Sequence, residues 1–295
     1  MIPARTVPTR RVAFTQEDGE LPRHYVSGDL VMSHVVAVLS SLFPNGEDFF
    51  VRSVRAYRHE VTDPELNRQV AGFIGQEAMH GRAHRQLNEA FQRLGYPTRL
   101  IDRRTDQVLK AVERLAGGPV RLAVTAALEH YTATLAEVLL GDPRAQAMLD
   151  TEAVRSFFLW HALEESEHKS VAFDVYQQVD GGHWRRVVVM NAVTVGFLAA
   201  VVLATVGSLL RDPASWNLPR LVRSAVGLRR SPFLAPGVAR RLRSYNRRGF
   251  HPDDWDATEL TGHWREVLFG EDGTLTGRVE GPPRNTPPAS PPTSA

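Results

Sequence analysis

The stretch Glu165-Ser166-Glu167-His168 repeats a pattern that the chain also carries at Glu77-Ala78-Met79-His80. Apolar residues recur at helical spacing around both copies, which places each copy within a long predicted helix. Residues three positions apart on an α-helix are neighbours on one face, with roughly 5–6 Å between their Cβ atoms. A glutamate and a histidine so placed can bind the same metal ion or pair of ions. One copy alone is a weak signal, since a solvated pair on an exposed face is its ordinary explanation.

Two further glutamates stand where a four-helix metal site needs them. Glu47 lies on the helix before the first motif, and Glu129 lies on the helix before the second, among small apolar residues. A carboxylate on an apolar face is costly to bury unless it is paired or bound to a metal. The order Glu, Glu-x-x-His, Glu, Glu-x-x-His matches the di-metal site of ferritin-like carboxylate proteins. We therefore predict six metal ligands: Glu47, Glu77, His80, Glu129, Glu165 and His168.

Several polar residues beside the motifs are predicted to have roles other than metal binding. His84 and His161 lie one helical turn from the motifs, and we expect them to orient the ligands through hydrogen bonds, because metal-bound histidines need an oriented partner. Glu164 and Glu167 point elsewhere on their helix, so salt bridges are expected for them. His130 follows Glu129 directly, about 100° around the helix, and is not expected to be a ligand.

The expected fold is all-α: a ferritin-like four-helix bundle with additional C-terminal helices. No alternation with a period of two, bounded by hairpin turns, predicts a strand. Helices are predicted over residues 27–42, 46–59, 64–94, 105–116, 119–140, 151–179, 187–210, 216–227 and 235–246, with a break at 43–46. The domain organisation predicted is an extended arm (1–23), a helical di-metal domain (24–250), a short helical or irregular segment (251–269) and a disordered proline-rich tail (270–295).

The segment from Val187 to Leu210 holds 24 residues without a charge. A helix that crosses a bilayer needs about 20 apolar residues, so this segment could span or dip into a membrane. Polar residues such as Asn191 and Thr194 dilute it, and a soluble bundle can also bury a helix that is apolar all round. Both interpretations stay open at this point.

Ten arginines and a single acid, Asp212, lie between Arg211 and Arg248. Such a cluster can bind phosphate-rich partners, including an anionic lipid surface. A solvated basic face is the alternative. The N-terminus lacks a continuous apolar segment of the secretory kind, so we expect a cytoplasmic protein, with association with the inner face of the cell membrane as a further expectation.

The 295-residue chain contains no cysteine, which excludes disulfides, thiolate metal ligands and iron–sulfur clusters held by cysteine. Its metals must therefore bind histidine and carboxylate, a donor set that suits iron, manganese or zinc. We expect two metal ions, with iron first and manganese and zinc as alternatives. Phosphate-binding and dinucleotide fingerprints are absent. No strand pattern of aromatic and basic residues suggests RNA recognition, so no nucleic-acid partner is expected.

The sequence also resembles the predicted metal-dependent hydrolase family of bacterial proteins. The resemblance covers roughly residues 25–250. It is carried by Pro44-Asn45-Gly46-Glu47, Gln76-Glu77-Ala78-Met79-His80, Trp160-His161, Glu164-Glu165-Ser166-Glu167-His168-Lys169 and Val171-Ala172-Phe173-Asp174-Val175-Tyr176. It implies the same six ligands and says little about the substrate.

Three functions fit these observations. The ligand set favours a di-iron enzyme that activates dioxygen and oxidises a hydrophobic small molecule or acyl chain. Such an enzyme would receive its electrons from an electron donor. Two metal ions could instead generate a hydroxide that attacks an ester or amide. The third is a non-catalytic protein in which the metal has a storage or structural role.

Overall fold

The computed structural model describes residues 6–14 and 21–280. Within these residues the chain is built from α-helices and short 3-10 helices, without strands. The predicted all-α class is confirmed.

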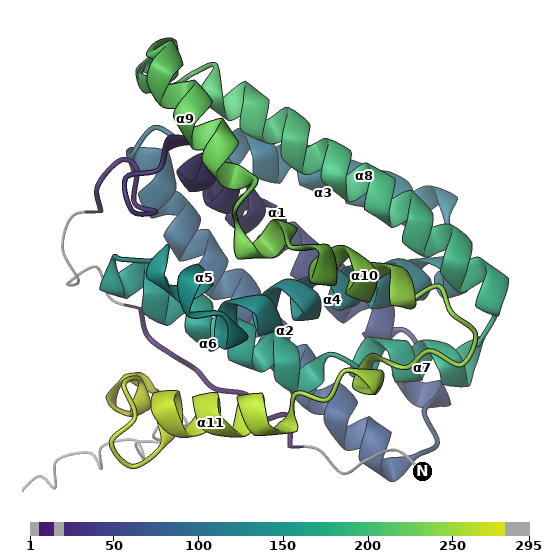
Figure 1. Cartoon of the computed structure of the whole chain (residues 1–295). Helices are drawn as coiled ribbons and strands as arrows, with labels where there is room; N and C mark the ends of the chain where they lie inside the picture. Colours follow the sequence, from purple (N-terminus) through teal and green to yellow (C-terminus); the bar gives the residue numbers. More distant parts are fainter. Residues whose placement is uncertain (1–5, 15–20, 281–295) are drawn as a thin grey trace, which may run out of the picture.

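Four long helices form the centre of the molecule (Figure 1). Helix α1 (Leu30–Arg55) packs against α2 (Pro64–Arg93), and α4 (Gly118–Gly141) packs against α6 (Glu152–His168). Contacts of α1 with α4 and of α2 with α6 close the four helices around one interior. Each pair combines one helix that carries a single predicted glutamate ligand with one that carries a Glu-x-x-His motif.

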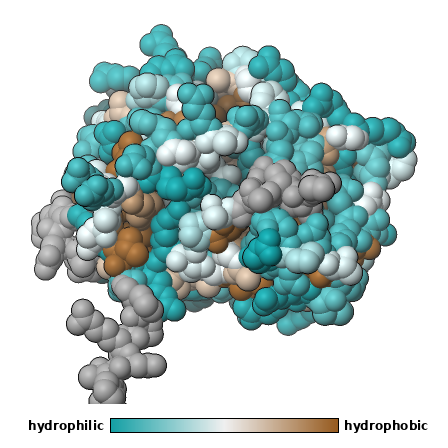
Figure 2. All heavy atoms as spheres, turned by 90° about the horizontal axis from the view of Figure 1, so that it is seen from below, coloured by the Kyte–Doolittle hydropathy of each residue, from teal (hydrophilic) through white to brown (hydrophobic). Residues whose placement is uncertain are grey.

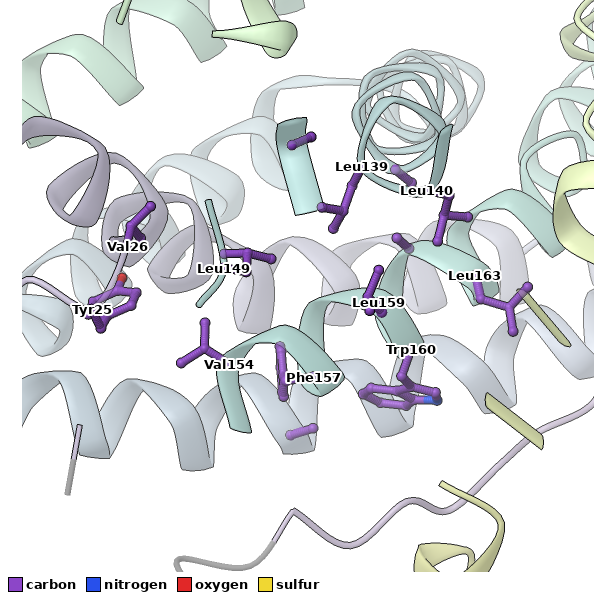
Figure 3. Packing of buried hydrophobic residues seen from close by; sticks show 14 of the residues in the cluster. Tyr25, Val26, Leu139, Leu140, Leu149, Val154, Phe157, Leu159, Trp160 and Leu163 are labelled. Carbon is purple, nitrogen blue, oxygen red and sulfur yellow. The ribbon is translucent and has the colours of Figure 1, made fainter. Parts of the chain in front are cut away.

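Apolar side chains fill the space between α4 and α6. Leu139 and Leu140 of α4 point toward α6, where Leu159 and Leu163 lie in the same buried cluster (Figure 3). Fully burying one leucine side chain contributes about 1.5–3 kcal/mol. Packing of this kind holds the two helices in fixed register, and with them the polar residues that they carry.

Helix α2 begins and ends where its sequence predicts. The Asp63 carboxylate accepts hydrogen bonds from the backbone N–H groups of Glu65 and Leu66, at 2.7 and 3.2 Å, which caps the helix. Gly95 follows the helix with a φ of +94°, a left-handed conformation that glycine adopts without strain.

The predicted break at 43–46 is wrong, because α1 continues through Pro44. Proline lacks the N–H that would bond the carbonyl of Ser40 one turn earlier. The amide nitrogen of Asn88 on α2 donates to that carbonyl instead, at 2.9 Å. A side chain of the neighbouring helix thus satisfies the freed backbone group, and the helix continues.

The single helix predicted over 151–179 is also wrong, because the chain turns at Lys169 and Ser170 between α6 and α7 (Val171–Val179). Lys169 is buried, and its ammonium group binds the Glu137 carboxylate of α4 at 3.0 Å and the backbone carbonyl of Trp255. The turn falls directly after His168 and brings this ammonium to its partners.

Shorter helices surround the four central ones. The predicted helices near 105–116, 216–227 and 235–246 are all present, although α3 begins earlier than expected, directly after Pro97. The helices are α3 (Thr98–Leu115), α5 (Pro143–Ala147), α9 (Leu218–Leu228), α10 (Pro236–Ser244) and α11 (Thr258–Phe269).

Helix α8 (His183–Leu209) lies along the outside of α1 and α4 (Figure 1). It is long and apolar enough to cross a membrane by length and composition. Only a small share of its most apolar part is buried, so the interpretation of this segment as a buried core helix is wrong. The bundle is already closed by its other helices, and α8 covers it with one side only.

Residues 6–14 of the predicted arm contain no helix and run along the body of the protein. The predicted start of the disordered tail at residue 270 is wrong. Leu275 is fully buried, and the backbone of Arg278 and Glu280 pairs with that of Ala13 and Arg11. The remainder of the predicted tail, 281–295, lies outside the described residues.

Candidate metal centre

All six predicted ligands converge in the interior of the four central helices. They come from α1, α2, α4 and α6, and each residue is at most 3% exposed. Elements that lie far apart in the sequence therefore meet at one point. The residues are Glu47, Glu77, His80, Glu129, Glu165 and His168.

Among the close groups that these donor atoms form, two share Glu77. One group joins Glu47, Glu77 and His80, and the other joins Glu77, Glu129 and His168; within each group the donor atoms lie within 4.8 Å of one another. His168 Nε2 lies 3.0 Å from Glu77 Oε1 and 3.3 Å from Glu129 Oε2. Glu165 Oε1 lies 3.5 Å from His80 Nδ1 and 3.7 Å from His168 Nε2, so Glu165 also faces both groups. Two adjacent groups with shared carboxylates have the form of a dinuclear site.

Hydrogen bonding within the protein leaves these groups unsatisfied. Nine buried polar atoms of the six residues lack a hydrogen bond of normal geometry, including both carboxylate oxygens of Glu47, Glu77 and Glu129. Leaving a buried polar group unsatisfied costs about 1–3 kcal/mol, and more when it is charged. Metal ions bound between the helices would satisfy all of these atoms together. The residues present therefore fit a metal pair.

The electrostatics of the cluster lead to the same conclusion. Burial raises the pKa of Glu47 well above its usual range, and the charge of Glu77 adds to the shift. The same two causes raise the pKa of Glu129 to about 8. Burial disfavours the charged form of His80, but its hydrogen bond to Glu164 and the nearby Glu165 carboxylate outweigh this effect and raise its pKa to about 10. Carboxylates this close need positive charge between them, from protons or from metal ions.

His80 is oriented by a carboxylate behind it. Its Nε2–H donates to Glu164 Oε2 at 3.0 Å, which leaves Nδ1 to face the cluster. Arg10 donates to Glu164 Oε1 at 2.9 Å. Such outer partners set the ring orientation and basicity of a ligating histidine. The predicted salt bridge of Glu164 is present, but the prediction missed that Glu164 also holds a ligand.

His168 has an analogous support. Its Nδ1–H donates to Gln76 Oε1 at 2.9 Å, and the Gln76 amide donates to Glu167 Oε2 at 3.0 Å. Arg10 and Arg265 both bind Glu167, which confirms the predicted salt bridging of this residue. Arg10 thus supports both histidines of the Glu-x-x-His motifs, although it comes from the N-terminal arm.

His161 and His84 lie on the α1 side of the cluster. His161 Nε2 is 3.0 Å from Glu165 Oε1 and 3.6 Å from Glu47 Oε1, so this ring reaches the ligands themselves. His84 lies behind it, with Nε2 at 3.2 Å from His161 Nδ1. His130 points elsewhere, and its Nε2–H donates to the backbone carbonyl of Arg241 at 3.1 Å.

His24, His34 and Asp212 form a second group of possible metal donors, but their polar atoms are satisfied by one another and by neighbouring side chains. His24 and His34 each place Nε2 at 3.0 Å from Asp212 Oδ2, and Arg23 donates to the same oxygen at 3.2 Å. Ser208 and Arg220 partner the remaining ring nitrogens, at 2.7 and 2.9 Å. These groups satisfy one another, so this arrangement needs no metal ion. It ties the residues before α1 to the end of α8.

A polar pocket of about 370 Å³ lies between α6 and α11. It is lined by Ser166, Glu167, Lys169, Thr261 and Arg265, among others, and by none of the six predicted ligands. The pocket therefore lies behind the ligands and does not open onto them.

The fold and this cluster define an all-helical protein whose buried carboxylates and histidines suit metal ions. The family described as predicted metal-dependent hydrolase matches residues 8–256, and the chain belongs to this family. The match includes Arg10 as well as every predicted ligand. Neither a curated protein nor a solved structure matches the chain.

Replacing Arg10 by Ala should weaken metal binding, because Glu164 loses its cation and Glu167 keeps only Arg265, so that His80 and Gln76 are held less firmly. Loss of outer partners of this kind lowers metal affinity by roughly 10–100-fold. Competition with a chelator measures the affinity. The neighbouring Arg11, whose side chain is exposed, provides the matched control as Arg11→Ala. Equal affinities for the two variants would contradict this role for Arg10.

Proposed function

We propose that the chain is a metal-dependent enzyme in which the six converging residues hold two metal ions. The observation that carries this proposal is the set of nine unsatisfied donor atoms gathered at one buried point. Glu77 and Glu165 would lie between the ions, because each faces both donor groups. Glu47 and His80 belong on one side, and Glu129 and His168 on the other.

We further propose that the metal is iron and that the enzyme oxidises a hydrophobic small molecule or acyl chain with dioxygen. Four carboxylates with histidines form the donor set of di-iron carboxylate proteins, and two bound iron ions would supply the electrons that activate dioxygen. The deep burial of the ligands favours a small apolar reactant such as dioxygen over a bulky polar one. An external electron donor would return the site to its reduced state between turnovers.

The chain's own contribution is a set of packed rings and hydrogen bonds around the two histidines. Trp160 packs edge-on against His80 at 5.0 Å between ring centroids, and Phe73 packs against His168 at 4.9 Å. Glu164 and Gln76 accept hydrogen bonds from the outer N–H groups of His80 and His168, so that the inner ring nitrogens carry no proton and can bind a metal ion.

Hydrolysis is the second candidate, and the family description favours it. Two metal ions lower the pKa of a bound water enough to make it a nucleophile at neutral pH. The same six residues would serve, with zinc or manganese as the metal. The substrate would then be an ester or amide that reaches the cluster through an opening of the helices.

Metal analysis and two assays distinguish these functions. Iron in the purified protein, with dioxygen consumed after reduction, supports the oxidase; zinc or manganese with turnover of a model ester supports the hydrolase. Two ions retained without either activity would contradict both enzymatic proposals and leave a structural role.

The double variant Glu77→Ala, His168→Ala should lose the metal while it stays helical, because it removes a shared carboxylate and the main nitrogen donor of one group. Elemental analysis and circular dichroism measure the two properties. Glu259 and His263 are exposed on α11, and their double replacement by alanine is the matched control. Metal retained at the wild-type ratio after loss of Glu77 and His168 would refute the site.

A further inference from the structure

The outward side of α8 is apolar. Val195, Val202 and Leu203 are 58–72% exposed, whereas Val189 and Met190 of the same helix are buried. Monomeric proteins rarely expose a continuous apolar surface of this extent unless it binds something. The outward apolar residues of α8 are Trp184, Val188, Val195, Leu198, Val202, Leu203, Val206 and Leu210.

The following segment extends this surface. After α8 the chain returns beside it through α9 and α10 (Figure 1). Trp216, Leu218, Val222 and Val226 are at least half exposed, whereas Ser224 faces the protein, where its hydroxyl accepts a hydrogen bond from the Val31 N–H at 2.8 Å. Together α8, residue 216 and α9 form what we call the α8–α9 face. The underside of the molecule, seen in Figure 2, is by contrast mostly hydrophilic.

Arginines far outnumber acids in the segment that carries the α8–α9 face, although Arg185 and Arg247 pair with Asp180 and Asp254 just outside it. Between residues 183 and 250 the only acid is Asp212, which is buried and bound to His24, His34 and Arg23. The arginines of this region whose side chains are exposed are Arg185, Arg211, Arg223, Arg229, Arg230, Arg240, Arg243, Arg247 and Arg248. Basic residues near an anionic membrane surface strengthen binding to it.

We propose that the α8–α9 face docks onto a bilayer that contains anionic phospholipids, with α8 lying in the plane of the membrane. The apolar side would enter the boundary between headgroups and acyl chains, and the arginines would contact the phosphates. A helix that crosses the bilayer would have to leave the bundle. That would break the Tyr131–Thr194 hydrogen bond at 2.8 Å and expose Ser208, which binds His34.

Vesicle flotation with the full-length protein tests this proposal. We expect binding to vesicles of phosphatidylcholine with phosphatidylglycerol, and much weaker binding to phosphatidylcholine alone. Val202→Asp should lower the partition coefficient about tenfold, because it places a charge among the inserted residues. Val267 is exposed on α11, and Val267→Asp is the matched control, expected to bind like the wild type. Circular dichroism verifies that both variants fold.

Three outcomes would overturn the proposal. The first is equal binding by Val202→Asp and the wild type. The second is a lack of vesicle binding combined with a dimer that Val202→Asp dissociates, which would make this face a contact between two copies of the chain. The third is protein that alkaline carbonate fails to release from the vesicles, which would indicate a helix that crosses the bilayer.

A second inference concerns His161 and is carried by a different observation, a chain of hydrogen bonds that begins at Pro44. The Asn88 amide nitrogen donates to the Ser40 carbonyl, which leaves Asn88 Oδ1 as an acceptor for the Ser40 hydroxyl at 2.7 Å. Since the Ser40 proton is used there, its oxygen accepts from His84 Nδ1–H at 2.9 Å. His84 Nε2 is then the acceptor for His161 Nδ1–H at 3.2 Å.

This order of donors fixes the tautomer of His161. Its Nε2 carries a lone pair and no proton, yet it faces the oxygens of Glu165 and Glu47 at 3.0 and 3.6 Å. A lone pair that faces two carboxylates is repelled unless a proton or a metal ion lies between them, and in the proposed site the metal ion takes this place. The geometry points to His161 as a seventh metal ligand rather than an outer partner, and His84 as the residue that orients it. This inference rests on the proposed metal site.

Cobalt(II) titration tests this assignment independently of activity. His161→Gly should bind cobalt about tenfold more weakly or worse, with a shifted visible absorption spectrum, and added imidazole should restore both properties. His130→Gly is the matched control, because His130 is buried but bonded only to a backbone carbonyl. An unchanged affinity and spectrum in His161→Gly would overturn the assignment, whereas a wild-type protein that binds no cobalt would instead refute the metal site itself.

Discussion

The concentration of four carboxylates at one buried point constrains the rest of the structure. Like charges at this separation repel strongly in a medium of low dielectric constant. The helices can carry these residues inward only if positive charge lies between them. Apolar clusters lie on either side of the centre, while the centre itself is left with unsatisfied oxygens that a cation would satisfy. Stability and metal binding are in this sense the same property of the bundle.

The surroundings of the site are built from segments that do not belong to the four central helices. The N-terminal arm contributes Arg10, which binds two glutamates that in turn hold a ligating histidine and a glutamine. On the opposite side of the cluster, a proline in α1 begins a chain of hydrogen bonds that ends at His161. Outer partners of this kind orient the ligands before a metal arrives, which reduces the cost of binding. The arm and the proline-containing helix α1 therefore both support the predicted site.

The sequence predicted the fold class, most helices and the convergence of the six ligands, because Glu-x-x-His spacing and helical periodicity are local signals. Prediction from the sequence was wrong or incomplete where the partner of a residue lies far away in the sequence. Pro44 predicts a break unless Asn88 is known to lie opposite its freed carbonyl. Arg10 lies in a segment without periodicity, so nothing in its surroundings marks it as a partner of Glu164. The side of α8 that faces outward depends on which helices close the bundle, and composition alone does not contain that information.

Anomalous X-ray scattering from crystals of the metal-loaded protein would test the central claim most directly. The account predicts two anomalous peaks between α1, α2, α4 and α6, both within bonding distance of Glu77 and Glu165, with an absorption edge that identifies the element. An empty centre, or ions found only at surface histidines, would contradict the claim that the buried carboxylates exist to bind a metal pair.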